Sequence, residues 1–142
     1  MTLVNQILHA KGSKTWTITP DATVFDALSL MAEKDIGSLV VVDNDDVVGI
    51  FSERDYARKI ILLGRSSRDT EVSEIMKNEV LCVSPDQSVA KVMALMTDKR
   101  IRHIPILDKG RLVGVISIGD VVKAIISEQQ IMINHLEDYM YS

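Results

Sequence analysis

The sequence predicts a mixed α/β fold, in which two pseudo-symmetric β-α-β-β-α repeats pack through their sheets and a helical extension follows at the C-terminus. The first reason is an internal repeat, because residues 16–64 align with residues 81–129 at a constant offset of 65 without a gap. The second is that the strand-like runs are continuously apolar, as in a sheet covered on both faces. Neither copy could cover its own sheet, so we expect the two sheets to pack together.

The repeat is clearest in short phrases. GIFSERD at residues 49–55 returns as GVISIGD at residues 114–120, and VNQIL at residues 4–8 resembles VSEIM at residues 72–76. The second pair defines a leading segment before each copy. We therefore expect four regions: repeat one with its leading segment in 1–64, a linker with the second leading segment in 65–80, repeat two in 81–129, and a helical extension and tail in 130–142.

Each copy predicts a strand, a helix, a hairpin of two strands and a second helix. Thr23 and Ser88 are the expected N-caps of the first helices, whose apolar residues recur at i, i+3, i+4 and i+7. Polar turns at residues 43–45 and 108–110 separate paired apolar runs and predict β-hairpins. We expect the methionines of the helical faces to pack in the core. They are Met31, Met93 and Met96.

The second helix is expected to begin at Ser52 in copy one and at Ser117 in copy two, where residues 127–139 extend it. Its apolar residues fall on opposite stripes that one core cannot bury, which predicts a homodimer. These residues are Ile60, Ile61, Ile125 and Ile126.

Composition excludes several classes of function. The net charge of −4 argues against broad nucleic-acid binding, which needs a basic surface to displace counterions. Cys82 is alone, so neither an internal disulfide nor a Cys-rich zinc site can form. No apolar run approaches the roughly 20 residues of a membrane span, and no basic start with a long apolar run opens the chain. We expect a cytoplasmic protein with no membrane partner.

Catalytic motifs do not occur in the sequence. Neither GxxxxGK[ST] nor GxGxxG is present, the three histidines are scattered, and Cys82 has no base near it in sequence. No His, Cys or carboxylate pair outside the repeats has metal-ligand spacing. We therefore expect no enzyme activity, no catalytic residue and no metal.

The paired β-α-β-β-α units, the VxxIM-like leading segments, HIPILD at residues 103–108 and the closing GVISIGD resemble the tandem cystathionine-β-synthase (CBS) domain pair, or Bateman module. The resemblance covers nearly the whole chain and, with no other domain attached, implies a stand-alone CBS-pair protein. It implies a non-catalytic sensor that binds AMP, ADP, ATP or NAD(H) between the repeats, forms a homodimer and modulates an unidentified protein. The alternative is a structural dimerisation module with empty clefts.

The repeated Ser-x-x-Asp phrase supplies the main candidate site residues. A helix beginning after Ser117 presents unpaired N–H groups that favour phosphate, and Asp120 can accept two hydrogen bonds from a ribose diol. Ser52 and Asp55 repeat this pattern. The spacing is also that of a capping box, in which each side chain only satisfies a backbone N–H.

The resemblance places phosphate-contacting residues at the start of the hairpin, where this sequence has Arg102 and His103. Copy one has Gly37 and Ser38 there, without charge, so the two sites should be unequal. The inserted loop at 11–14 is expected to approach the base and nearby phosphate. Further candidates are Ser13 and Lys14 in this loop, Ser38, Arg54 in a basic cluster with Arg58, Lys59, Arg65 and Arg68, and Asn78 as a weaker contact to adenine.

Overall fold

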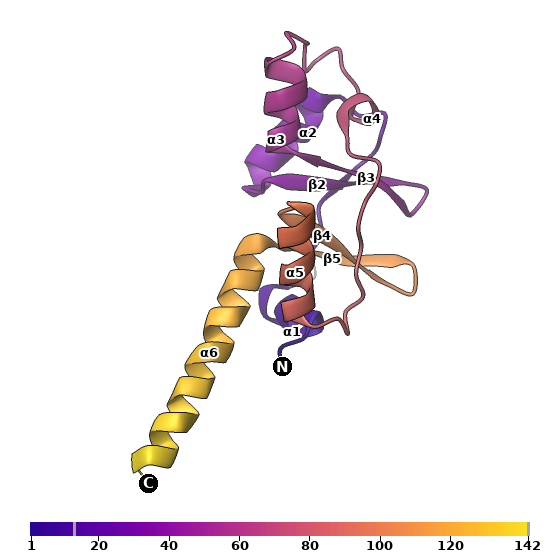
Figure 1. Cartoon of the computed structure of the whole chain (residues 1–142). Helices are drawn as coiled ribbons and strands as arrows, with labels where there is room; N and C mark the ends of the chain where they lie inside the picture. Colours follow the sequence, from indigo (N-terminus) through magenta and orange to yellow (C-terminus); the bar gives the residue numbers. More distant parts are fainter. Residues whose placement is uncertain (13, 142) are drawn as a thin grey trace. The chain divides into compact units, whose positions relative to one another are not determined.

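The structure is a computed structural model that describes residues 1–12 and 14–141 (Figure 1). The chain divides into two compact units, each described here by itself. The central unit is Thr15–Leu81, and the terminal unit combines Met1–Lys14 with Cys82–Ser142. Among the described residues, no helix is long and apolar enough to cross a membrane.

The central unit holds a three-stranded sheet in the order β1-β2-β3, with β1 parallel to β2 and β2 antiparallel to β3. Its helices follow the predicted order, but the second one changes after one turn into a π-helical turn, η1. The elements are β1 (Thr17–Ile18), α2 (Val24–Lys34), β2 (Ser38–Asp43), β3 (Asp46–Ser52), α3 (Glu53–Tyr56), η1 (Ala57–Ile61) and α4 (Val72–Ile75).

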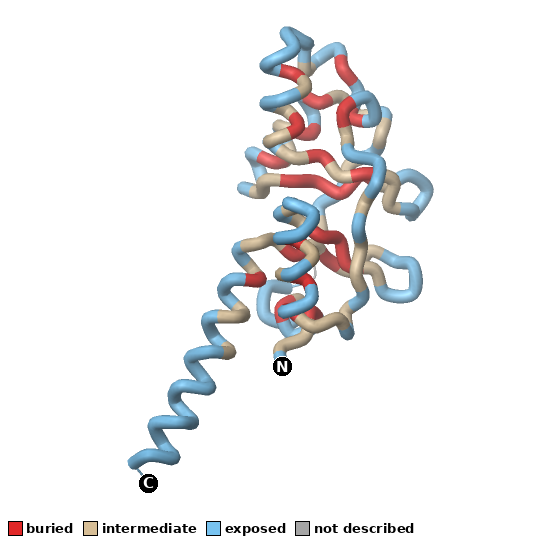
Figure 2. Tube along the Cα trace, in the orientation of Figure 1, coloured by how far each residue is buried: buried red, intermediate tan, exposed pale blue. Residues whose placement is uncertain are grey.

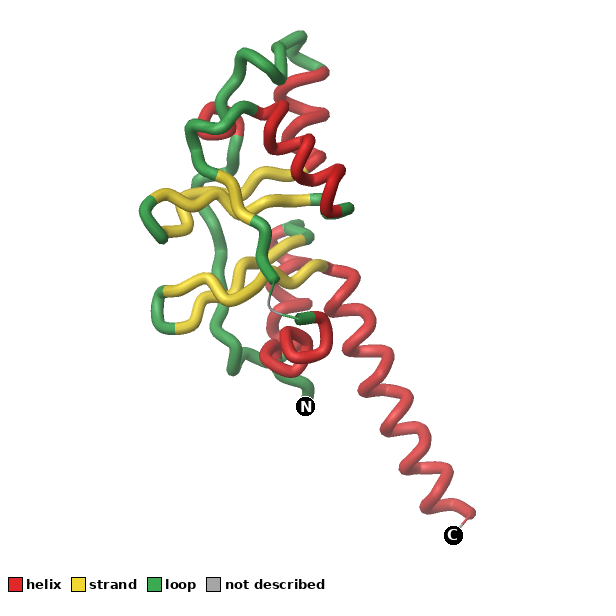
Figure 3. Tube along the Cα trace, turned by 180° about the vertical axis from the view of Figure 1, so that it is seen from behind, coloured by secondary structure: helices red, strands yellow, loops and turns green. Residues whose placement is uncertain are grey.

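The terminal unit repeats this plan around one antiparallel hairpin (Figure 3). The expected first strand of copy two is reduced to a single parallel bridge between Val83 and Ile106. The last helix continues without a break to Tyr141, which confirms the predicted C-terminal extension. The elements are α1 (Val4–Lys11), α5 (Val89–Lys99), β4 (His103–Asp108), β5 (Arg111–Ser117) and α6 (Ile118–Tyr141).

The local sequence signals explain why these elements form where they do. Thr23 Oγ1 accepts a hydrogen bond from the Asp26 N–H at 3.1 Å, which confirms the N-cap of α2. In the first hairpin, Asn44 and Asp45 have φ of 50° and 69°, the pair of positive values that a type I′ turn requires. Ser88 caps α5 in the same way, and the turn of the second hairpin also has positive φ at both residues.

Each unit has its own hydrophobic core (Figure 2). The buried core of the terminal unit is aliphatic, and that of the central unit also contains Phe51. Met31 and Met96 are both 2% exposed, and Met93 packs against the core of the terminal unit, so the expected role of the methionines is confirmed. Of the isoleucines expected on opposite stripes, Ile60 is buried whereas Ile61 and Ile126 are exposed. The opposite-facing stripes therefore exist.

The leading segments are exchanged between the two repeats. Helix α1 precedes copy one in sequence but packs in the unit of copy two, where the Val4 N–H donates to Gln87 O at 2.9 Å. Helix α4 precedes copy two but packs in the unit of copy one, where the Val72 N–H donates to Ala22 O at 2.8 Å. The compact units therefore differ from the sequence regions 1–64 and 81–129.

The exchanged segments lie close to the hairpins at two glycines, where an added Cβ would displace a side chain of the segment. A Cβ on Gly114 of β5 would lie 2.5 Å from Leu8 Cδ2, and one on Gly49 of β3 would overlap the side chain of Met76. Real Cβ atoms do not approach other atoms this closely, so at each position the neighbouring side chain would have to move. The Val-Gly pair that recurs in the sequence thus marks where each leading segment contacts its strand.

Candidate functional site

Asp120 lies in the first turn of α6, directly after β5 ends at Ser117. The Ser117 N–H donates to Asp120 Oδ2 at 2.9 Å, and the Asp120 N–H donates to Ser117 Oγ at 3.2 Å. This reciprocal pair is a capping box, the alternative that the Ser-x-x-Asp spacing left open. The cap uses Oδ2 and so leaves Oδ1 of the carboxylate available for another donor.

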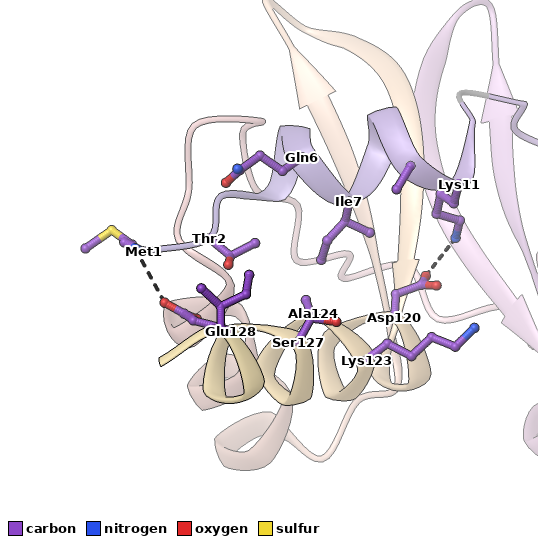
Figure 4. A pocket seen from close by; sticks show the side chains of 12 residues that line it. Met1, Thr2, Gln6, Ile7, Lys11, Asp120, Lys123, Ala124, Ser127 and Glu128 are labelled. Carbon is purple, nitrogen blue, oxygen red and sulfur yellow. Dashed lines mark hydrogen bonds and ion pairs between the residues drawn. The ribbon is translucent and has the colours of Figure 1, made fainter. Parts of the chain in front are cut away.

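Lys11, the last residue of α1, reaches the same carboxylate (Figure 4). Its Nζ donates to Asp120 Oδ2 at 2.7 Å and to the Val115 carbonyl oxygen at 2.9 Å. The Lys11 side chain is 38% exposed and that of Asp120 is 19% exposed, so the ion pair borders solvent. A solvent-bordering pair of this kind contributes little net stability, since water competes for both groups.

The electrostatics of this cluster favour a charged Asp120 and a neutral His103. Burial would raise the pKa of Asp120, but hydrogen bonds from Lys11 and Ser117 outweigh it and hold that pKa below its ordinary value. Burial lowers the pKa of His103, with the positive charges of Lys11 and Arg102 adding to the effect and Asp120 opposing it. The terminal unit thus gathers Lys11, Arg102, His103, Ser117 and Asp120 in one region.

A pocket of about 560 Å³ lies between α1 and α6 within the terminal unit, and Asp120 lines it (Figure 4). Apolar side chains from both helices form part of its wall, and Lys11, Lys123 and Glu128 supply charge. Glu128 Oε1 also forms an ion pair with the N-terminal ammonium nitrogen of Met1 at 3.4 Å. The volume falls within the range of roughly 300–1,000 Å³ that small-molecule sites occupy.

The equivalent residues of copy one form a more deeply buried arrangement. Both the Ser52 N–H and the Ser52 hydroxyl donate to Asp55 Oδ2 at 3.0 Å, and the Asp55 N–H donates to Ser52 Oγ at 3.3 Å. Lys59 Nζ lies 3.8 Å from Asp55 Oδ1, and the Asp55 side chain is only 4% exposed. Asp55 is therefore less accessible to a ligand than Asp120, whose side chain is 19% exposed.

The other predicted site residues have varied environments. Arg102 is exposed at the start of the second hairpin and His103 is half-buried beside it, whereas Ser38, the equivalent of His103, is buried. Lys14 and Asn78 are exposed in irregular segments, and Arg54 is half-buried in α3. Ser13 lies outside the described residues.

Lys11 and Lys59 each form an ion pair with one of these carboxylates, but the sequence does not single out either lysine as a main site residue. The sequence placed Lys11 in a loop, but it ends α1, and only the exchange of leading segments brings it to a carboxylate 109 residues away. Lys59 belongs to the basic cluster named in the sequence analysis. Its i, i+4 spacing from Asp55 is the sequence signal that indicates an ion pair between them. No cluster suited to a metal ion occurs among residues 1–12 and 14–141.

Comparison with known proteins identifies the family. A model of the CBS domain matches residues 13–62 and 72–127, one match for each sequence repeat. The chain therefore belongs to the CBS domain family and carries the domain twice.

Similar proteins include both sequences and solved structures. The chain is 44% identical over 136 residues to the Arabidopsis thaliana protein named CBS domain-containing protein CBSX3, mitochondrial, and the match covers 92% of this chain and 66% of that one. A protein with CBS domains from Burkholderia ambifaria has a TM-score of 0.86 at 54% identity, covering 90% of this chain and 96% of that one. A CBS domain pair solved with 5′-methylthioadenosine and S-adenosyl-L-methionine has a TM-score of 0.78 at 25% identity, covering 87% and 99%.

Proposed function

We propose that the chain is a non-catalytic regulatory module that binds an adenine nucleotide, with Asp120 as the ribose contact. One observation carries this proposal: Asp120, a charged and partly exposed carboxylate, lines a pocket together with Lys11. Arg102 and His103 do not line that pocket, but His103 is close enough to Asp120, Lys11 and Arg102 for their charges to act on it. Membership of the CBS domain family supports it, as does the related CBS pair that holds two adenosine-containing ligands.

The chemistry of the ligand follows from the charges of the cluster. A ribose diol offers two hydroxyl donors, which a carboxylate accepts well, while phosphate suits Lys11, Arg102 and the imidazole of His103. In this arrangement Lys11 releases Asp120 Oδ2 when the ribose arrives and turns to the phosphate. Such an exchange of partners is inexpensive because the Lys11–Asp120 pair borders solvent.

Copy one would contribute less to binding. The Asp55 side chain is 4% exposed, against 19% for Asp120, so a ligand would reach it less easily. Gly37 and Ser38 bring no charge where copy two has Arg102 and His103. We therefore expect one nucleotide site of high affinity, with the remaining candidates Ser13, Lys14, Arg54 and Asn78 adding at most secondary contacts.

Regulation requires that the nucleotide bind one conformation more tightly than another, since a ligand with equal affinity for both shifts nothing. We infer that the module acts as a homodimer on a separate protein in the cytoplasm. The name of the Arabidopsis relative places that relative in mitochondria. Cell fractionation would show the compartment in which the present protein is found.

The test is a calorimetric and thermal-shift titration of the full chain with AMP, ADP, ATP, NAD and NADH, with adenosine and GMP for comparison. We expect at least one adenine nucleotide to bind and to raise the melting temperature, and we expect Asp120→Asn to remove that response. If none of them binds at millimolar concentration, the proposal is wrong.

A structural dimerisation module is the second candidate, and a specific observation favours it. Both Ser-x-x-Asp phrases form complete capping boxes, and each carboxylate already has a lysine beside it. Under this alternative, the titration gives no heat while the chain still self-associates.

A further inference from the structure

Helix α6 carries an exposed stripe whose residues recur at alternating spacings of four and three. Five of its six members are apolar, and these five are 40–71% exposed. The members are Val122, Ile126, Gln129, Ile133, Leu136 and Met140. This spacing is that of the seam between two packed helices.

Within the described part of the terminal unit, the apolar members of the stripe stay exposed to solvent. Val121 is the buried residue of α6, and the pocket is lined by a different face that includes Ala124, Ser127 and Ile131. The C-terminal part of α6 extends beyond the other elements of its unit and is exposed along its length (Figures 1 and 2). The match to the CBS domain also ends at residue 127, so four of the six members lie beyond the matched domain.

We propose that this stripe docks, in antiparallel orientation, onto the same stripe of a second copy of this chain. The spacings of four, three, four, three and four read the same from either end, so the stripe is symmetrical about residue 131. A two-fold axis at that point sets Val122 against Met140 of the second copy and Ile126 against its Leu136. Every member of the stripe then meets another member, as an isologous interface requires.

The charges of α6 select the antiparallel orientation. Glu137 and Asp138 lie near the C-terminal end of the helix, where the dipole is already negative and the last turn has no basic residue. Lys123 lies 14 residues before Glu137, which is two heptads, so both flank the stripe on the same side. Antiparallel docking brings Lys123 close to Glu137 of the second copy, whereas parallel docking would bring the acidic ends together.

The polar member of the stripe fixes the register. In the proposed register Gln129 faces Ile133 of the second copy, and the two Gln129 side chains lie four positions apart along the paired helices, about one helical turn. A single polar residue in an apolar helix seam specifies alignment because a shifted register would leave it among apolar side chains. A slip by one heptad would also leave the stripe unpaired at both ends.

Self-association of the full chain provides the first test, measured by sedimentation velocity over a wide range of concentration. We expect Leu136→Glu to raise the dissociation constant of α6 pairing by about a hundredfold or more, because each dimer loses two buried leucines. Asn134→Glu adds the same charge on the polar face, beside Gln130, and should leave association unchanged. Identical sedimentation of wild type and Leu136→Glu at every concentration would overturn the proposal.

The orientation has its own test in a Cys82→Ser background. We expect an oxidised disulfide when Val122→Cys and Met140→Cys chains are mixed, and none when either variant is oxidised alone. Cross-linking of Met140→Cys to itself would refute the antiparallel arrangement. Nucleotide binding should be the same in Leu136→Glu as in wild type, so failure of this proposal and failure of the nucleotide proposal are distinguishable.

Discussion

Lys11 Nζ lies 2.7 Å from Asp120 Oδ2, so the end of the first helix is joined to the start of the last one. The two residues are 109 positions apart in the sequence. The contact exists because α1 packs in the terminal unit. It holds the carboxylate charged and in place, and it is the first interaction that a ligand of Asp120 would have to replace.

The acid stability of the protein should depend on Asp120. The folded protein holds the pKa of Asp120 below its ordinary value of 3.8. The charged Asp120 therefore stabilises the fold fully when the pH is above 3.8. This contribution to the free energy of unfolding is lost as the pH falls through the lower pKa of the folded state. Wild type should therefore be more stable than Asp120→Asn at pH 7 and pH 5. Chemical denaturation should show this difference shrinking below about pH 4. An unchanged difference at pH 3 would contradict the prediction.

Asp120→Ala and Asp55→Ala should have different effects. Asp120→Ala should weaken nucleotide binding by roughly ten- to a hundredfold, since charged hydrogen bonds contribute about 1.5–3 kcal/mol. Asp55→Ala should instead lower the free energy of unfolding by about 1–2 kcal/mol, because it leaves the donors of Ser52 without their acceptor. Calorimetry and denaturation of both variants decide the matter. Equal losses of affinity would show that both carboxylates hold ligands.

Replacing Arg102 should affect ligands according to their phosphate. We expect Arg102→Ala to weaken AMP much more than adenosine, because an exposed guanidinium can grip phosphate in a bidentate manner. Arg111→Ala is the matched control, since Arg111 is also exposed and begins the strand that Ser117 ends. Equal loss for AMP and adenosine would place Arg102 away from the phosphate.

The pKa of the His103 imidazole should rise when a phosphate binds beside it. Burial, Lys11 and Arg102 keep its pKa below 6.5 in the free protein despite Asp120, so protonation opposes folding and stability falls as the pH drops below 6.5. His103→Gln should remove this part of the pH dependence. An NMR titration of the imidazole should show its midpoint rising when AMP binds. A midpoint above 6.5 without ligand would contradict the expectation.

Gly114→Ala should destabilise the terminal unit by about 1–3 kcal/mol, because the new Cβ overlaps Leu8. Leu8→Ala should reduce this cost in the double variant, which a double-mutant cycle measures. Gly119→Ala is the control, since its Cβ would lie 3.6 Å from Ser117 Oγ and alanine favours the helix. Additive effects of Gly114→Ala and Leu8→Ala would argue against the close contact.

Local signals in the sequence predict much of the fold. Thr23 and Ser88 mark the starts of α2 and α5, and the polar turns mark both hairpins, because caps and turns depend on neighbouring residues. The π-helical turn at Ala57–Ile61 has no such signal in the run ARKII.

The contacts of the candidate site were harder to predict than the residues. Similarity between VNQIL and VSEIM shows that the segments are equivalent, but it does not show which unit each one joins. The pairing of Lys11 with Asp120 depends on that choice. Whether a capping box also binds a ligand depends on exposure and neighbouring cations, which separate Asp120 from Asp55 only in three dimensions.

The exchange of leading segments also determines the order in which the two units can fold during synthesis. Thr15–Leu81 is one continuous stretch and can complete its core as soon as it leaves the ribosome. Helix α1 emerges earlier, yet its packing partner β5 is made only after the whole central unit, at residues 111–117. At about 5–20 residues per second, α1 waits several seconds for β5 with Val4 and Ile7 uncovered. During that interval, chaperones or a neighbouring nascent chain have access to the apolar side of α1.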